Sequence, residues 1–589
     1  MKELLNKLSQ KRYQFPHHTF LETVVRSFSP AERVLFGVFF ILLIWGAGSM
    51  ILRINNFFLT EIPAQGGELQ EGIIGSPRFI NPLLVQSDAD RDLAALIYSG
   101  LLKATPEGEL VPDLAERFTV SEDTLTYTFT LREDARFHDG TPVTADDVLF
   151  TIQKAQDSVL KSSKRANWEG VTVTKINDRE IKLILNQPYA PFLENATLGI
   201  LPKHLWKDAD AEQFPFSPYN IDAVGSGPYR LSSIKRNNSG IPIYMELKPF
   251  RKYALGMPHI ARLTFRFYSN EKDLLEALTR GEIESANAIT PSSAKELQEK
   301  GFNMERTPLP RIFGVFFNQN QAPLLADKNV RQALELATDK NKIVDTVLHG
   351  YGITIESPIP PLLLETTSGD VVPREKRLEK ANALLDTILW KRDPKTGFRT
   401  KTTGKQTQKL TFSLATSNVP ELKGSAELLK EMWRDIGVDL TVQIYESGDL
   451  NQNIIRTRKY DALLFGEIVG RDLDLFAFWH SSQRNDPGLN ISLYTNSKVD
   501  RLLEEARRIG DREKRIENYK AVTAEIERDT PAIFLYSPEF IYIFPKKIKG
   551  NRLERSTIPS ERFLTIHDWY INTEKVWGVF AKDKNVEQI

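Results

Sequence analysis

The sequence predicts a mixed α/β protein with at least two lobes, preceded by one transmembrane helix. Three observations support this: a length of 589 residues, an uncharged apolar stretch at residues 34–52, and helix and strand patterns that alternate along the rest of the chain. A single hydrophobic core stops growing at roughly 250–300 residues, so a chain of this length is expected to divide into more than one lobe.

The apolar stretch at residues 34–52 reads VLFGVFFILLIWGAGSMIL and is long enough to cross a bilayer. A helix needs about 20 apolar residues to span roughly 30 Å of hydrocarbon. Basic residues outnumber acidic ones before the stretch, whereas Arg53 is the only basic residue among several acids just after it. The positive-inside rule therefore places residues 1–33 in the cytoplasm and the bulk of the chain on the extracellular or periplasmic side of the cell membrane.

Two other interpretations of this stretch stay open. A cleaved signal peptide would be cut near residues 47–49, although signal peptides have shorter apolar runs of about 7–15 residues. A buried core helix is the third interpretation. An uncleaved single-pass anchor is favoured because the run is long and a long region precedes it. Residues 53–67 contain Asn55, Asn56, Pro63 and two adjacent glycines, so they are expected to form a stalk.

Local patterns predict the elements of the outer part. Residues 124–131 (TLTYTFTL) alternate large apolar side chains with threonine, which is typical of a half-buried strand, and HDGTP at 138–142 predicts a turn. Capping and stop signals add four expected elements and an insertion. These are helices that begin after Thr144 and Asp327, a helix that ends at Gly437, a strand at 438–445, and an exposed hairpin or insertion at 391–409.

Composition excludes several classes of function. Lys+Arg and Asp+Glu both number 77, so the net charge is zero, and the chain contains no cysteine. A zero net charge argues against nucleic acid as a partner, because binding phosphates needs a basic excess. The lack of cysteine excludes a thiol nucleophile, a disulfide framework, a cysteine-ligated zinc and a lipidated cysteine anchor.

No metal or catalytic motif stands out in the sequence. The eight histidines form no paired metal signature, and no nucleophile elbow or phosphate loop is present. Asp88, Asp90 and Asp92 resemble the start of a calcium loop, but Leu93 and Ser99 occupy the positions that need glycine and glutamate. These acids instead favour the first turn of a helix. We expect no cofactor, no metal site and no enzymatic activity.

Six groups of residues follow one another along the chain. They are RFINPL (78–83) with IYSGLL (97–102), PDLAE (112–116), FTLR (129–132) with FHDGTPVTADDV (137–148), VGSGPY (224–229), NVRQAL (329–334) with ATD (337–339), and YDA (460–462) with Asn490, Tyr494 and Asp500. Together they resemble the family 5 extracellular solute-binding proteins, which include the oligopeptide-, dipeptide- and nickel-binding components of ABC importers. Most of these residues are expected to be scaffold, and Arg331 is expected to form a structural ion pair.

The resemblance implies a two-lobed, periplasmic-binding-protein-like fold of type II with an extra subdomain, in which the lobes close over a ligand. The expected division is lobe I at 68–318 with a subdomain at about 110–220, lobe II at 319–537, and a C-terminal segment at 538–589 that returns to lobe I. The implied function is a monomeric substrate-binding protein of an ABC-type importer, which delivers a short peptide or related small solute to the ABC permease subunits.

Two loops are expected to line the cleft if the resemblance holds. Loop 86–89 would contribute Ser87, Asp88 and Ala89 as ligand-binding residues. The loop after the YDA motif would contribute Glu467, Ile468, Val469, Gly470, Arg471 and Asp472. Trp168 and Trp479 are further candidates for a cleft wall, and a packed core tryptophan is the alternative for both.

The sequence departs from the peptide binders at one point. In those proteins a tryptophan follows the glycine of this loop, and an aspartate three residues later receives the peptide's α-ammonium. This chain has Glu467 and Gly470 at the two positions. The candidates for the missing negative charge are Asp88, Glu467, Asp472 and Asp474, and such a charge binds an ammonium well only when desolvated.

Two functions of other classes stay open beside the importer component. One is a membrane-tethered ligand sensor or chaperone-like receptor on the same fold, which would need a signalling partner because the cytoplasmic tail is short. The other is a hydrolase on a borrowed fold, with Glu467 or Asp472 as candidate residues.

Overall fold

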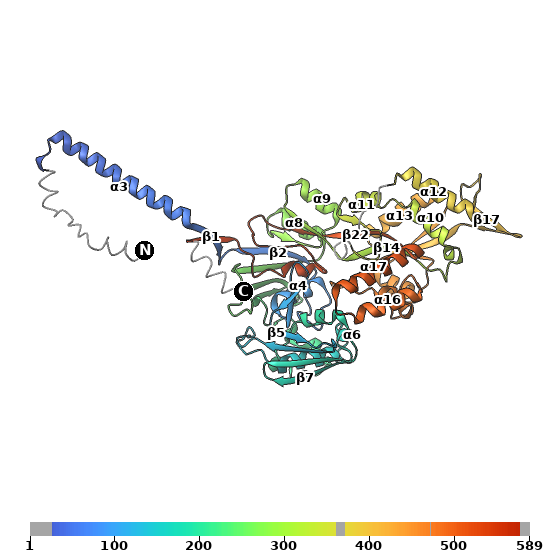
Figure 1. The fold of residues 1–589 in the computed structure, drawn as a ribbon, viewed down its shortest axis with the longest axis horizontal. Helices are drawn as coiled ribbons and strands as arrows, with labels where there is room; N and C mark the ends of the chain where they lie inside the picture. The colour runs from blue at the N-terminus through green and yellow to red at the C-terminus, as the bar shows by residue number, and fades with distance from the viewer. Residues whose placement is uncertain (1–25, 361–371, 472, 578–589) are drawn as a thin grey trace, which may run out of the picture. The chain divides into compact units, whose positions relative to one another are not determined.

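The computed structural model describes residues 26–360, 372–471 and 473–577. By contacts the chain divides into two compact units, Met1–Pro63 with Thr573–Ile589, and Ala64–Asn572. Each is described by itself below, and Figure 1 shows the elements of both.

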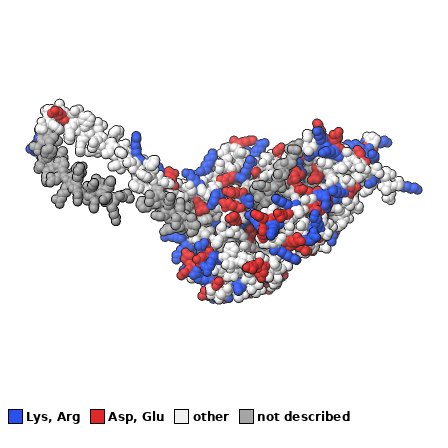
Figure 2. Space-filling model, viewed as in Figure 1, with Lys and Arg blue, Asp and Glu red and all other residues white. Residues whose placement is uncertain are grey.

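The first unit contains the expected apolar helix, α3 (Pro30–Phe58). Ser29 and Glu32 form a capping box at its start, and none of its residues is buried. It is long and apolar enough to cross a membrane, and it is nearly free of charged side chains in Figure 2. The segment 53–67 is more regular than a stalk. The helix continues to Phe58, and β1 (Leu59–Ala64) pairs with β23 (Asn572–Trp577), so most of this segment is helix or strand.

One continuous sheet runs through the second unit. The strands of its lobe II part are β20 (Asp439–Tyr445), β19 (Thr411–Ser417), β21 (Ala462–Ile468), β14 (Arg311–Phe317) and the long β22 (Ala532–Ile543). Strand β14 falls within the range expected for lobe I, but it pairs with β21 and is therefore counted with lobe II here. The sheet continues into lobe I through β12 (Ser285–Ala286), β2 (Glu68–Ile74), β11 (Arg262–Tyr268), β10 (Pro242–Pro249) and β9 (Tyr229–Arg236). The two halves of β22 therefore belong to different lobes, and in Figure 1 this strand lies between β14 and lobe I.

The lobe II sheet is covered on both faces. Alternate residues of β14 enter different cores, with Val315 in one and Phe316 in the other. Helices α10 (Lys328–Ala337) and α13 (Pro420–Arg434) pack on the first face, whereas α16 (Ser497–Arg508) and α17 (Arg512–Asp529) pack on the second. Such a sheet between two helical layers is the α/β architecture that the sequence predicts.

Lobe I contains a second, antiparallel sheet of four strands in the order β5-β6-β8-β7. Their bounds are Ala115–Val120, Thr126–Leu131, Glu180–Leu185 and Val171–Asn177 respectively. This sheet and the lobe I part of the large sheet share one hydrophobic core, which also takes in Phe563 and Trp569 from the C-terminal segment.

Most predicted elements are confirmed with small shifts. The structure contains the expected elements as α4 (Asp88–Ile97), β6, α5 (Ala145–Gln156), α10, α13 and β20. The expected hairpin or insertion at 391–409 is a separate sheet of three strands, β16 (Lys391–Arg392), β17 (Arg399–Thr403) and β18 (Gln406–Lys409). The strand expected from residue 124 begins at Thr126 because Thr124 has a φ of 55° and belongs to the preceding turn.

Arg331 was expected to form an ion pair, but its hydrogen-bond partners in the structure are backbone carbonyls. Its guanidinium donates to four backbone carbonyls, those of Leu325, Ala326, Asp529 and Thr530, at 2.6–3.0 Å. Helix ends leave carbonyls without intrahelical partners, and the planar guanidinium satisfies several of them at once. Arg331 thus ties the start of α10 to the end of α17.

Candidate functional site

One cavity of about 190 Å³ is lined by both lobes. Lobe I contributes the end of α4 and the strand that follows, and the C-terminal segment contributes residues around Glu561. Arg471 comes from lobe II. The lining includes Ala95, Tyr98, Ser99, Lys103, Asp113, Tyr253, Arg471, Glu561 and Phe563.

Arg471 connects the lobes at this cavity. Its guanidinium lies 2.6 Å from Glu561 and 3.4 Å from Glu194, both in lobe I, and its side chain is only 11% exposed. Nearby, the Tyr189 hydroxyl of lobe I donates to Asp474 at 3.4 Å. Arg471 is therefore held against lobe I by ion pairs that are largely shielded from solvent, where such contacts are stronger than on the surface, and Asp474 is held there by a hydrogen bond.

Buried polar groups form the lobe I wall of the cavity. Lys103 Nζ donates to the Tyr253 hydroxyl at 3.0 Å. Burial raises the pKa of Asp113 to about 6, although the nearby Lys103 charge opposes the rise. Burial also lowers the pKa of Lys103. Asp113 Oδ1 and the Tyr98 hydroxyl have no hydrogen-bond partner among the residues that the structure describes, so this wall can still bind polar groups.

The residues of loop 86–89 mainly start a helix. Ser87 caps α4 by accepting from the backbone N–H of Asp90, and Ala89 is fully buried. Asp88 forms a 2.8 Å ion pair with Arg91 one turn later, and both side chains are partly exposed. Of the three predicted residues, Asp88 alone therefore presents an accessible charged group.

The second loop divides between core and surface. Glu467 and Val469 are buried on the face of β21 that carries Leu463, whereas Ile468 is 52% exposed and Gly470 is exposed. Because successive strand residues point to opposite faces, Glu467 lies on the same face of the sheet as Leu463 and Val469, which belong to the core that α16 and α17 cover. Arg471 reaches lobe I as described above, and Asp472 lies outside the described residues.

Glu467 is a fully buried acid whose carboxyl oxygens have no hydrogen-bond partner among the described residues. Burial raises its pKa well above the usual value, so the folded state disfavours the ionised form of this side chain. A buried carboxyl that resists ionisation is poorly suited to replace the aspartate that receives an ammonium. Asp474 is held by Arg507 at 2.7 Å, so it is already neutralised.

The two candidate tryptophans are core residues. Trp168 is 2% exposed and packs edge-on against Phe192 in the lobe I core. Trp479 is 1% exposed and packs against Phe316, Tyr494 and Phe534 in lobe II. Neither lines the cavity between the lobes.

Sequence reasoning missed most of the residues that line this cavity. Tyr98, Ser99 and Asp113 belong to the IYSGLL and PDLAE groups, which were interpreted as scaffold. The sequence did contain a signal for these residues, because each is a polar side chain within a largely apolar motif, and such a side chain needs a hydrogen-bond partner when it is buried. Glu561 and Tyr253 stand in no recognisable pattern.

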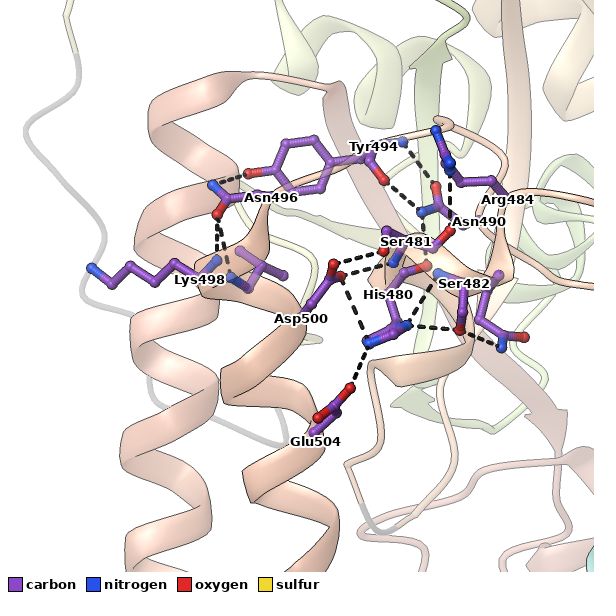
Figure 3. A network of polar contacts seen from close by, with 12 residues as sticks. His480, Ser481, Ser482, Arg484, Asn490, Tyr494, Asn496, Lys498, Asp500 and Glu504 are labelled. Carbon is purple, nitrogen blue, oxygen red and sulfur yellow. Dashed lines mark hydrogen bonds and ion pairs between the residues drawn. The ribbon is translucent and has the colours of Figure 1, made fainter.

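A polar network in lobe II explains the downstream motif residues (Figure 3). Asp500 on α16 accepts from the backbone N–H and hydroxyl of Ser481, and Asn490 donates to the carbonyls of His480 and Tyr494. His480 Nδ1 lies 2.7 Å from the hydroxyl of Ser482, and its Nε2 lies 3.3 Å from Glu504. The contacts fix the chain between Trp479 and α16, which is a scaffold role. No group of acids and histidines suited to a metal ion occurs within the described parts of the chain.

The fold and the cavity together define a two-lobed binding protein of the periplasmic class. Residues 109–487 match the family described as bacterial extracellular solute-binding proteins, family 5 Middle. This match covers more than half of the chain, so the protein belongs to that family of extracellular solute-binding proteins, which the sequence motifs had indicated.

Several characterised proteins are similar over nearly their whole length. The oligopeptide-binding protein AppA of Bacillus subtilis is 28% identical over 86% of this chain and 92% of its own, and the dipeptide-binding protein of Escherichia coli is 26% identical over 81% and 90%. The structure of AppA with a nonapeptide superposes with a TM-score of 0.67 at 26% identity, over 87% of this chain and 100% of that one. NikZ of Campylobacter jejuni with Ni(L-His) gives 0.65 at 26% identity, over 85% and 99%.

Proposed function

We propose that this protein is a membrane-anchored substrate-binding protein of an ABC importer, which encloses a short peptide or related small solute between its lobes. Membership of the family supports the binding role, because the family consists of binding proteins and not of enzymes. The names of the relatives support peptides as the solute class, while Ni(L-His) in NikZ marks an alternative.

The observation that carries this proposal is the cavity between the lobes, with Arg471 reaching across it. Pockets for small ligands usually measure about 300–1,000 Å³, so a cavity of about 190 Å³ is too small for a whole peptide. We infer that a peptide enters when the contacts of Arg471 and Asp474 to lobe I break, and that the lobes then close on it. Hinge motion of this kind is the usual device of such proteins.

The N-terminal unit supports a retained anchor. The Trp577 ring stacks on Phe58 with centroids 5.9 Å apart, and its indole N–H donates to Asn55 at 2.8 Å. Phe57 is 84% exposed beside them. These aromatic side chains follow the apolar run by about two helical turns, where tryptophan and other aromatic rings favour the interface of a bilayer. A tether of this kind would raise the effective concentration of the protein near its permease.

Thermal shift and mass spectrometry test the proposal. The full-length protein in nanodiscs should show a rise in Tm with members of a peptide library, because a ligand that binds only the native state stabilises it. Native mass spectrometry should detect a co-purified peptide. If neither a shift nor a co-purified peptide is found, the peptide function is wrong. Intact-mass analysis of the membrane fraction tests the anchor, which a cut near residues 47–49 would refute.

A further inference from the structure

The cavity between the lobes combines apolar lining with a few polar groups. Leu102, Phe563 and Leu564 are among its apolar lining residues, and the first two are almost fully buried. Tyr98 and Asp113 line the same cavity and are only 5% and 3% exposed. This combination suits a ligand group with an apolar stem and a polar head.

Two buried oxygen atoms on the lobe I wall have unused hydrogen-bonding capacity. Neither the Tyr98 hydroxyl nor Oδ1 of Asp113 has a hydrogen-bond partner among the described residues. A polar atom that is buried without a partner costs free energy, and native proteins contain few of them. Two such atoms on the wall of one cavity therefore indicate that a polar group binds there.

The scaffold fixes the Tyr98 side chain in this position. Its backbone N–H donates to the carbonyl of Ala94 at the end of α4, at 2.9 Å. A Cβ atom at Gly199 would lie 2.7 Å from Tyr98 Cβ, and one at Gly225 would lie 2.9 Å from Tyr98 Cδ1. The two glycines thus leave just enough room for this side chain beside the cavity.

Backbone contacts fix Asp113 in the same way. Its N–H donates to the carbonyl of Leu101 at 3.0 Å, and its carbonyl accepts from Arg132 Nε at 2.6 Å. Leu101 and Lys103 are two residues apart, so Lys103 and Asp113 lie on the same side of this pair of chain segments. Both residues line the cavity, which agrees with this placement.

The charges around the cavity are balanced. Within the described parts of the chain, its lining contains two acids, Asp113 and Glu561, and two cations, Lys103 and Arg471, and Arg471 lies 2.6 Å from Glu561. A charged ligand group would leave one charge uncompensated away from water, which is unfavourable. An uncharged group that both donates and accepts suits the cavity better. A primary carboxamide carries both functions on neighbouring atoms.

We propose that this cavity is a side-chain pocket of the solute cleft that selects the carboxamide of a glutamine or asparagine in a peptide. Asp113 accepts from the carboxamide N–H, and the Tyr98 hydroxyl donates to its carbonyl. The proposal rests on the proposed function, since it assumes a peptide bound between the lobes. A cavity of about 190 Å³ is too small for a whole peptide but has room for one such side chain.

Calorimetry on the full-length protein in nanodiscs tests the pocket. The probes are tetra-alanine peptides in which each position in turn is glutamine, norleucine, glutamate or lysine. Burial raises the pKa of Asp113 to about 6, so the measurement is made at pH 8, where the carboxylate can accept. At one position at least, glutamine should bind about 10- to 100-fold more tightly than norleucine, which has a similar chain without the carboxamide. Glutamate and lysine should also bind more weakly there.

Tyr98→Phe should lose most of this preference. The Tm of its unliganded form should stay the same or rise, because the lost hydroxyl has no partner among the described residues. The control is Tyr536→Phe, which removes a buried hydroxyl from the lobe II core and should keep the preference. Asp113→Asn should shift the preference towards glutamate, because Lys103 then lacks its negative neighbour.

Three results would overturn the pocket and leave the proposed function intact. They are equal binding of glutamine and norleucine peptides by the wild type, an unchanged preference in Tyr98→Phe, and a lower Tm of that variant, which would indicate a structural role for the hydroxyl. An Asp113→Asn protein that still rejects glutamate would contradict the role of Asp113. If no peptide binds at all, the peptide function is wrong and the pocket with it.

Discussion

Arg562 and Arg311 are both drawn away from solvent in the second unit, but their surroundings differ. Arg562 is fully buried, lies within hydrogen-bonding distance of Glu71 and Asp92, and has the Tyr542 hydroxyl in the same network. Burial alone would lower the pKa of Arg562, but the two carboxylates outweigh it and raise the pKa. The Nε of Arg311 has no hydrogen-bond partner within the described parts of the chain, and burial lowers the pKa of this side chain. In the core of lobe I the buried arginine has a carboxylate partner for its charge, whereas near the boundary between the lobes buried polar groups lack hydrogen-bond partners among the described residues.

The largest effect should follow from removing the completed network. Arg562→Met leaves Glu71 and Asp92 buried without their cation, and we expect a loss of about 3–5 kcal/mol in the free energy of unfolding. Denaturant unfolding measures it. The control is Arg552→Met, an exposed arginine whose pairs with Glu107 and Asp568 should contribute little. Equal losses in the two variants would show that the buried network has no special weight.

The opposite sign is expected at Glu467, the incomplete site in lobe II. Glu467→Leu should stabilise the protein by about 1–3 kcal/mol at pH 8, because it removes a buried polar group without a partner. The raised pKa means that the folded state keeps this carboxyl protonated, whereas the unfolded chain ionises it above about pH 4.5. The wild type therefore loses stability as the pH rises above that value, and the advantage of the variant should shrink towards pH 4.

Exposed Glu505→Leu serves as the matched control for Glu467→Leu. It should change the unfolding midpoint little at either pH. If Glu467→Leu destabilises the protein at pH 8, the carboxyl has a partner that contributes to folding, and the contrast between the two lobes would not hold.

A smaller effect is expected from the ion pairs that join the lobes. Arg471→Gln removes the contacts to Glu194 and Glu561 and should destabilise the contact between the lobes by about 1–2 kcal/mol. Small-angle scattering of the unliganded protein should then report a larger radius of gyration than that of the wild type. An unchanged radius would mean that other contacts determine the closure.

The smallest effect should come from the first unit, where the contacts are exposed. Trp577→Ala removes the stacking on Phe58 and the bond to Asn55, which should cost less than about 1.5 kcal/mol locally. Hydrogen exchange in nanodiscs should show faster exchange in β1 with no change in the unfolding of residues 64–572. Destabilisation of the second unit by this variant would contradict the division into two units.

Much of the fold could be predicted because its signals are local. Thr144, Asp327 and Gly437 mark helix ends through their own side chains or φ angles, and the alternation before Leu131 is visible over a few residues. The family could be predicted too, because its six motifs are mostly turns, caps and buried contacts that recur with the fold.

The site was predicted less well because it depends on distant partners. The side chains of Trp168 and Trp479 give no sign in sequence of whether they face a cleft or a core. Arg471 was expected to contact ligand, and the structure places it between Glu194 and Glu561, which lie far from it in sequence. The predicted ligand-binding set as a whole stays a prediction.

The sequence by itself determined the apolar N-terminal helix, the α/β class and the family, since each depends on the order and period of neighbouring residues. Only the tertiary structure decided which charges are compensated. Asp88, Glu467 and Asp474 look alike as acids in the sequence, yet Asp88 is paired at the surface, Glu467 is buried with a raised pKa, and Asp474 is held by Arg507. The reason is physical: the pKa and the energy of a charge depend on its burial and on partners that only the folded chain brings near.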